Sequence, residues 1–169
     1  ILATCDVPLD AQFGTPQGPI AMGDLIKNAQ MTANDKEEVI WTLQLLCRYL
    51  PPNTEWVNAK GEKWSIERLV RIQLSKAIDP TAINGGTDGL ITLTAARNAW
   101  LLTGKPLEGA WLDADNTIKK HIQLVQDHQN FNGTLSSNFF GAGGDMKDFD
   151  KHLASSGALL QFLMVALSD

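Results

Sequence analysis

Apolar residues recur at helical spacing along most of the chain. Three segments carry them on one side only: Met22–Met31, Ser65–Lys76 and Leu107–His128. Steps of three or four residues between apolar positions place those side chains on one face of a helix. The pattern therefore predicts three amphipathic helices, each with one face in contact with the rest of the protein.

Three other segments are apolar nearly all the way round a helix. They cover residues 35–50, 88–103 and 149–167. A helix without a polar face is typical of the interior of a protein, so these segments predict buried helices. Asn34, with Glu37 three residues on, forms a capping-box pattern at the start of the first of them.

The remaining segments predict no regular element. Residues 1–20 are rich in Pro, Gly and Thr, and predict an extended lead-in. Residues 53–64 and 129–149 are expected to be loops, because neither contains a long enough alternation of apolar and polar residues to predict a strand. The sequence thus predicts one all-α domain over residues 21–169.

Amphipathic and apolar helices alternate along the chain, which divides it into three helical hairpins. An inner layer of three apolar helices, covered by an outer layer of three amphipathic ones, would bury every apolar face. An ordinary helical bundle is the alternative, and it does not require this strict alternation. The pattern favours the layered array.

A local motif gives the first resemblance to a known family. Residues Gln129-Asn130-Phe131-Asn132-Gly133-Thr134-Leu135 follow an amphipathic helix. They resemble the Q-x-x-x-G-x-W turn of the α/α-toroid proteins, the fold of terpenoid cyclases and of protein prenyltransferase β-subunits, with Leu135 in place of Trp. The resemblance implies an α/α-toroid-like array. Six helices would make a half-toroid or a small bundle.

The chain is also similar to a group of uncharacterised toroid-like proteins from planctomycete-type bacteria, over most of residues 20–169. The segments that carry this likeness include Tyr49-Leu50-Pro51-Pro52, Gly85-Gly86-Thr87 and Leu163–Asp169. That group is expected to have Cys-Gly-Gly-Thr-His at the head of the inner helix. Here Asn84 and Asp88 stand at the Cys and His positions, so metal or thiol chemistry is not carried over.

Charge and composition narrow the classes of partner. The chain has 14 Lys and Arg against 19 Asp and Glu, a net charge of −5, and 44% hydrophobic residues. An acidic chain without a basic cluster predicts no nucleic-acid partner. The longest apolar stretch, Leu153–Leu167, is interrupted by Ser155 and Gly157 and is shorter than the roughly 20 residues that span a membrane. No membrane span is therefore expected.

The sequence leaves the compartment open. A first residue of Ile1 predicts a processed product or one part of a longer protein. Cys47 lies in an apolar helix and is predicted to be a small core residue. A Cys5–Cys47 disulfide remains an alternative if the protein is exported or belongs to the cell envelope, which the sequence does not decide.

The head of the second apolar helix is the strongest candidate ligand site. Its two glycines allow a close approach of the backbone, and a helix N-terminus presents free N–H groups. The alternative is a tight turn in which Thr87 or Asp88 is the N-cap. Two further residues, near the head of the last helix, would support a site if they shared a pocket with Asp88. The candidate ligand-binding residues are Gly85, Gly86, Thr87, Asp88, Asp145 and His152.

Two other patterns predict neither a catalytic acid nor a metal site. Asp113-Ala114-Asp115-Asn116 lacks the last Asp of the Asp-x-Asp-Asp acid of terpenoid cyclases, and its two carboxylates point about 200° apart on a helix. Both are predicted to be solvated. His121 and His128 share one helix face without a neighbouring Cys or carboxylate cluster, so they are predicted to be exposed. The sequence therefore predicts neither a metal site nor a cofactor.

The five tryptophans divide into two sets. Trp41 and Trp100 lie in apolar helices and are predicted to be core residues. Trp56, Trp64 and Trp111 have two interpretations: they line a groove for a sugar or a peptide, or they pack the long loop before the third helix.

Two functions from different classes follow. The first is a non-catalytic binding or assembly module, because no cluster of convergent polar residues is visible. It would associate with itself or with the remainder of a longer chain. The alternative is a fragment of a toroid-type lyase, glycosidase or cyclase, with its site at the heads of the inner helices.

Overall fold

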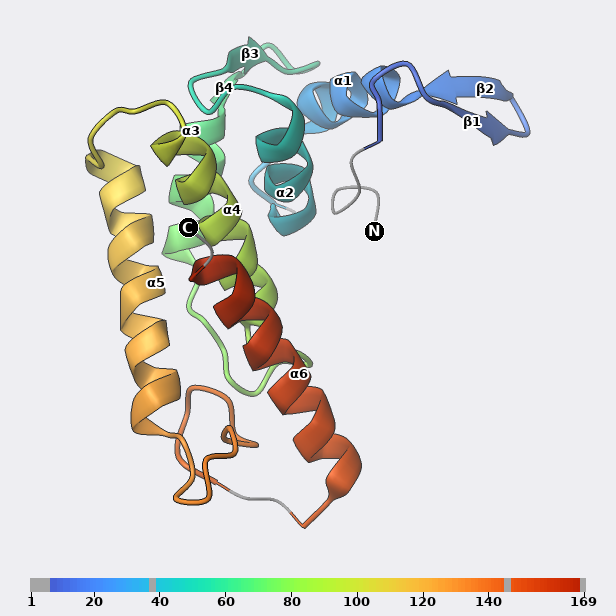
Figure 1. Ribbon diagram of the computed structural model, residues 1–169. Helices are drawn as coiled ribbons and strands as arrows, with labels where there is room; N and C mark the ends of the chain where they lie inside the picture. Colours follow the sequence, from blue (N-terminus) through green and yellow to red (C-terminus); the bar gives the residue numbers. More distant parts are fainter. Residues whose placement is uncertain (1–6, 37–38, 145–146, 168–169) are drawn as a thin grey trace.

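The computed structural model describes residues 7–36, 39–144 and 147–167, and this part of the chain is mostly helical (Figure 1). Each of the six predicted helical segments forms a helix, with ends that differ by a few residues from those expected. In chain order the elements are β1 (Gln12–Thr15), β2 (Gly18–Ala21), α1 (Met22–Thr32), α2 (Ile40–Tyr49), β3 (Glu55–Val57), β4 (Lys63–Ser65), α3 (Ile66–Ser75), α4 (Thr87–Leu101), α5 (Gly109–Asp127) and α6 (Phe149–Ala166).

Two short antiparallel hairpins correct the sequence analysis, which expected an extended lead-in and a loop. β1 pairs with β2, so that Phe13 lies opposite Ile20. β3 pairs with β4, so that Trp56 lies opposite Trp64. Strands of three or four residues are too short to show a recognisable alternation, which is why the pattern missed them. The described part of the chain is therefore mostly helical, with two small β-hairpins.

The helices form two layers around α4. α4 packs between α2 and α6, and these three helices make one layer. The other layer contains α3 and α5, which pack against each other and against α4, and α1, which packs against α2. Figure 1 shows α5 and α6 flanking α4, with the hairpin β1–β2 beyond α1. This arrangement leaves α4 as the most enclosed helix.

The core is centred on α4, as predicted for an apolar helix. Leu90, Leu93 and Ala96 of α4 are fully or almost fully buried. They belong to one continuous hydrophobic core, to which the neighbouring helices also contribute. Their fully buried contributions include Leu43 and Leu46 from α2, Leu69 and Val70 from α3, Ala114 from α5, and Leu159 and Phe162 from α6.

α2 and α6 are less buried than the sequence predicts. Trp41 of α2 is 57% exposed, so the prediction that it is a core residue is wrong. Leu160 and Met164 of α6 are also exposed. Both helices pack on α4 through one face, and no third layer among the described residues covers the other face. Of the three apolar helices, only the central one, α4, is buried over most of its length.

The sequence analysis predicted N-cap residues for α3 and α2, and the structure confirms only the first. The Ser65 hydroxyl accepts a hydrogen bond from the Arg68 backbone N–H and caps α3, as predicted. α2 begins at Ile40, and the Asn34 side chain instead accepts from the Lys36 N–H before the helix. Asn34 is therefore not the N-cap of α2. Glu37, the other half of the expected capping box, lies outside the described residues.

Candidate functional site

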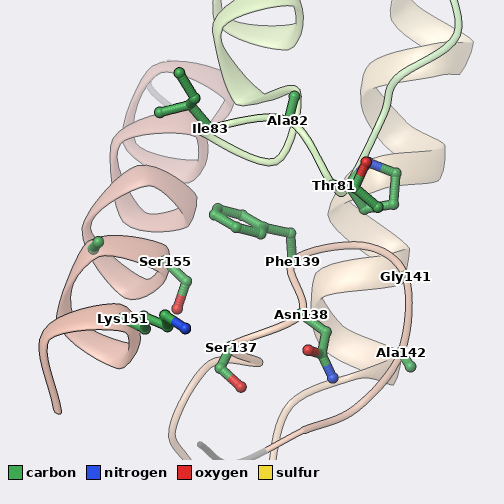
Figure 2. A pocket seen from close by; sticks show the side chains of 12 residues that line it. Thr81, Ala82, Ile83, Ser137, Asn138, Phe139, Gly141, Ala142, Lys151 and Ser155 are labelled. Atoms are coloured by element: carbon green, nitrogen blue, oxygen red, sulfur yellow. The ribbon is translucent and has the colours of Figure 1, made fainter. Parts of the chain in front are cut away.

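Two grooves lie on either side of the loop that leads into α4. The α6-side groove has a volume of about 540 Å³ and is formed by residues 80–83, the loop at 137–142 and the first turns of α6. Figure 2 shows Phe139 pointing across it toward Ile83, with Lys151 and Ser155 approaching from α6. The α2-side groove, about 530 Å³, lies between α2, the end of α3 and the head of α4.

Ile83 stands on the ridge between the two grooves. It is 98% exposed and, together with Ala82, lines both of them. A single exposed apolar side chain is common on protein surfaces, so its exposure alone does not indicate a ligand. Two grooves thus meet at the head of α4, and the α2-side groove contains residues of the predicted site.

The turn before α4 requires both of its glycines. Gly85 and Gly86 have φ values of +59° and +80°, in the left-handed region. A Cβ on Gly85 would lie 2.1 Å from the Phe139 ring, which occupies that space. Thr87 donates its backbone N–H and its hydroxyl to the Asn84 carbonyl. The geometry is that of a tight turn, and the N-cap is Gly86 rather than Thr87 or Asp88.

The predicted site residues are distributed over the two sides of this turn. Gly86 and the half-buried Asp88 line the α2-side groove, and Asn84 Nδ2 donates to Asp88 Oδ2 at 2.9 Å. His152 lines neither groove, although its neighbour Lys151 lines the other one. Asp145 lies outside the described residues. The structure thus brings Gly86 and Asp88 together and leaves His152 apart from them; ligand binding by these residues stays a prediction.

Gln73 is a residue of this region that the sequence analysis missed. It lies in α3, is only 3% exposed and lines the α2-side groove. Its Nε2 occupies the place of a side chain on Gly89, since a Cβ there would be 2.5 Å away. Its Oε1 is buried and has no hydrogen-bond partner among the described residues. A glycine in the first turn of an otherwise apolar helix was the available signal of such a close approach.

The buried carboxylate of Asp115 corrects another prediction. Asp113 is exposed, as expected, but Asp115 is buried beside Arg97 and Lys119. Two positions apart on a helix, the two aspartates face opposite sides, so one side chain points to solvent and the other to α4. The spacing of the two aspartates predicts that they face opposite sides of the helix, but not which carboxylate faces the protein interior.

The prediction that both helix histidines are exposed is also wrong. His121 is buried, and its Nδ1 lies 2.8 Å from the Thr117 carbonyl oxygen. Its ring packs against the Phe140 ring in a T-shaped arrangement, with 5.0 Å between the ring centroids. Burial lowers the pKa of His121. His128 is half-buried. No three His, Cys, Asp or Glu side chains in the described ranges are grouped so that they could hold a metal ion.

The tryptophans named as groove candidates serve packing. Trp64 and Trp111 are buried, Trp56 is half-buried, and none of them lines the grooves at the head of α4. Trp111 stacks on Trp100 with 4.7 Å between ring centroids. The tryptophan that does line a groove is Trp41, on the α2 side. Trp56 and Trp64 pack within the 53–65 segment, in agreement with the packing interpretation. Trp111 packs on α4 instead, and the exposed tryptophan, Trp41, is one that was assigned to the core.

A third groove, of about 540 Å³, runs over α4 between α2 and α6. Small side chains, Ala95 and Ala99, form part of its lining with Cys47 of α2. Cys47 is a free, buried thiol, and burial raises its pKa to about 12. Cys5, the partner in the alternative disulfide, lies outside the described residues.

No family model, curated protein or solved structure matches the chain. Among the described helices, none combines the length and the apolar character that crossing a membrane requires.

Proposed function

We propose that this chain is a non-catalytic assembly module with an α/α-toroid-like layout, in which α2, α4 and α6 are the inner helices of three hairpins. The pairing of neighbouring elements supports this layout, because α4 packs between α2 and α6 while α3 packs on α5. In a closed array each inner helix would have an inner neighbour on both sides, whereas here only α4 does. α6 is at the end of the row, so one of its sides is available to a partner.

An exposed apolar stripe on α6 carries the proposal. Residues separated by steps of four, three, four and three lie along one side of the helix, and all of them are exposed. This spacing is that of a helix seam which packs against another helix. Gly157 has no atom within 4 Å of the place of its Cβ, so a partner backbone can approach closely there. The α6 stripe consists of Leu153, Gly157, Leu160, Met164 and Leu167.

The partner we propose for the α6 stripe is a second copy of this chain. Residues 152–167 contain no Asp, Glu, Lys or Arg, so two copies of the stripe meet without like-charge repulsion. Two-fold pairing of identical surfaces is the commonest arrangement of soluble oligomers. A contiguous apolar surface of this kind gains free energy when a partner removes it from water.

Light scattering of the purified chain over a range of concentrations tests the proposal. The chain should exceed its monomer mass of 18.4 kDa, and Leu160→Asp should return it to the monomer. Leu112→Asp is the matched control, because Leu112 is an exposed leucine of α5. A monomer at every concentration would exclude self-association. Equal masses for both variants and the unmodified chain would exclude the α6 stripe as the interface.

The alternative is a fragment of a toroid-type enzyme with its site at the heads of the inner helices. The α6-side groove favours it, because the groove lies between the heads of α4 and α6. Lys151 is the one ionisable side chain in its described lining, however, and general acid–base chemistry usually needs a positioned pair. Assembly therefore remains the first proposal.

A further inference from the structure

The chain contains two Asn-Gly pairs, and both lie in turns of the described structure. Asn84-Gly85 belongs to the turn before α4, and Asn132-Gly133 belongs to the loop between α5 and α6. In such a pair the backbone nitrogen of the glycine can attack the side-chain amide of the asparagine, because no Cβ hinders its approach. The two turns hold their asparagines in different ways, so the two pairs should differ in reactivity.

The Asn132 side chain has two hydrogen-bond donors on the oxygen at which charge would develop. Its Oδ1 accepts from the Thr134 backbone N–H at 3.1 Å and from the Thr134 hydroxyl at 2.7 Å. Asn130 Nδ2 donates to the same hydroxyl oxygen at 3.0 Å, which directs the hydroxyl hydrogen toward Asn132. Attack on Cγ makes Oδ1 an oxyanion, so these two donors stabilise the intermediate more than the starting amide.

The backbone at Asn132 is exposed and has room to change conformation. Asn132 and Gly133 are both exposed, and no atom lies within 4 Å of the place of a Cβ on Gly133. The Gly133 N–H donates to the Asn130 carbonyl oxygen at 2.8 Å, and this bond must open before the nitrogen attacks. No hydrogen bond from the described residues holds the main-chain carbonyl of Asn132 itself. The peptide between the two residues can therefore rotate without disturbing a helix.

Asn84 is restrained by the head of α4. Its Nδ2 donates to Asp88 Oδ2 at 2.9 Å, and this carboxylate opposes the development of negative charge beside it. Its main-chain carbonyl accepts both the backbone N–H and the hydroxyl of Thr87. Gly85 is buried against the Phe139 ring, so rotation of this peptide would disrupt the start of the helix. The folded structure thus opposes the reaction at Asn84.

We propose that Asn132 is a site of spontaneous deamidation, assisted by Thr134, and that the fold protects Asn84. The Gly133 nitrogen forms a bond to Asn132 Cγ, the Cγ–Nδ2 bond breaks, and the NH₂ group leaves as ammonia with the proton of the Gly133 N–H. Water then opens the resulting cyclic imide at either carbonyl, which gives aspartate or isoaspartate. The loop before α6 gains one negative charge.

Peptide mapping by mass spectrometry tests the site, after incubation of the full chain in mildly alkaline buffer. Fragmentation should assign a gain of one mass unit to Asn132, and Asn84 should react about tenfold more slowly or less. In urea the two rates should become similar, because the Thr134 and Thr87 hydrogen bonds are lost. Equal rates in the folded chain overturn the proposal. So does the absence of product at Asn132 over a time in which the unfolded chain reacts.

Thr134→Val separates the assistance of the hydroxyl from the exposure of the loop. Valine keeps the branched shape and removes one donor to Asn132 Oδ1, so deamidation of Asn132 should slow severalfold or more. Thr117→Val is the matched control, because the Thr117 hydroxyl donates within α5 to the Asp113 carbonyl oxygen. Its rate should equal that of the unmodified chain. An unchanged rate in Thr134→Val would overturn the role of Thr134. None of these residues belongs to the α6 stripe, so the test does not depend on self-association.

Discussion

Arg97 of α4 and Asp115 of α5 form an ion pair inside the helical layers, with 3.6 Å between Nη1 and Oδ1 and side chains only 14% and 5% exposed. Arg97 Nη2 also donates to the Ala166 carbonyl oxygen at 3.2 Å, at the last turn of α6. Lys119 Nζ lies 2.7 Å from the other carboxylate oxygen of Asp115. One guanidinium thus connects three helices.

Removal of the Asp115 charge should destabilise the fold. Asp115→Ala leaves the Arg97 guanidinium largely buried without its carboxylate, and breaking such a pair costs about 3 kcal/mol. Chemical denaturation monitored by circular dichroism measures the loss. Asp113→Asn, at the exposed carboxylate of the same helix, should change the free energy of unfolding by less than about 0.5 kcal/mol. Equal effects in the two variants would contradict the inward orientation of Asp115.

Truncation of aromatic residues should distinguish the core from the α2-side groove. Phe162 is fully buried, so Phe162→Ala should cost about 3–5 kcal/mol. Trp41 is largely exposed, so Trp41→Ala should cost less than about 1 kcal/mol. Urea unfolding of both variants measures the difference. A larger loss in Trp41→Ala would mean that its indole is buried in solution.

Protonation of His121 should make the fold less stable in mild acid. Burial is the main cause that lowers the pKa of this imidazole, so it stays neutral in the folded chain while the unfolded chain takes up a proton near pH 6.5. Because the unfolded state then binds more protons, the free energy of unfolding falls as the pH drops below that value, and it stops falling below the lowered folded pKa.

The measurement is urea unfolding of the chain at a series of pH values across this window. His121→Gln should flatten the decrease, since glutamine does not titrate. His152→Gln is the comparison variant, because it removes a histidine that lies on another helix and is less buried than His121. A pH dependence that persists in His121→Gln would assign it to another group.

The Cys47 thiol should react slowly in the folded protein. Its pKa of about 12 leaves almost no thiolate at pH 8, and burial limits access. A disulfide reagent added to a Cys5→Ser variant reports on Cys47 alone. The absorbance of the product released by the reagent should rise slowly without denaturant and rapidly in urea. Rapid reaction in the folded state would show that the groove between α2 and α6 opens.

The residues that surround the candidate ligand site could be identified only from the tertiary structure. The glycine pair, Gly85 and Gly86, was visible as a turn signal, and so was the start of the helix that follows. Gln73 was not visible as a groove residue, because a glutamine in an amphipathic helix has the same pattern whether its amide meets solvent or a neighbouring helix. Its burial depends on α4 passing close by at Gly89.

The sequence by itself determined the six helices, because apolar spacing and local start signals such as Ser65 act within a few residues along the chain. It did not determine which apolar side chains are covered. Trp41 and Phe162 both lie in apolar helices, yet one is exposed and the other is buried. Likewise, Asp113 and Asp115 differ only in the side of α5 that they occupy. Whether an apolar side chain is buried depends on its contacts with helices that are distant in the sequence. α2 and α6 bury only the faces that pack against α4 and its neighbours, and these contacts exist only in the folded structure.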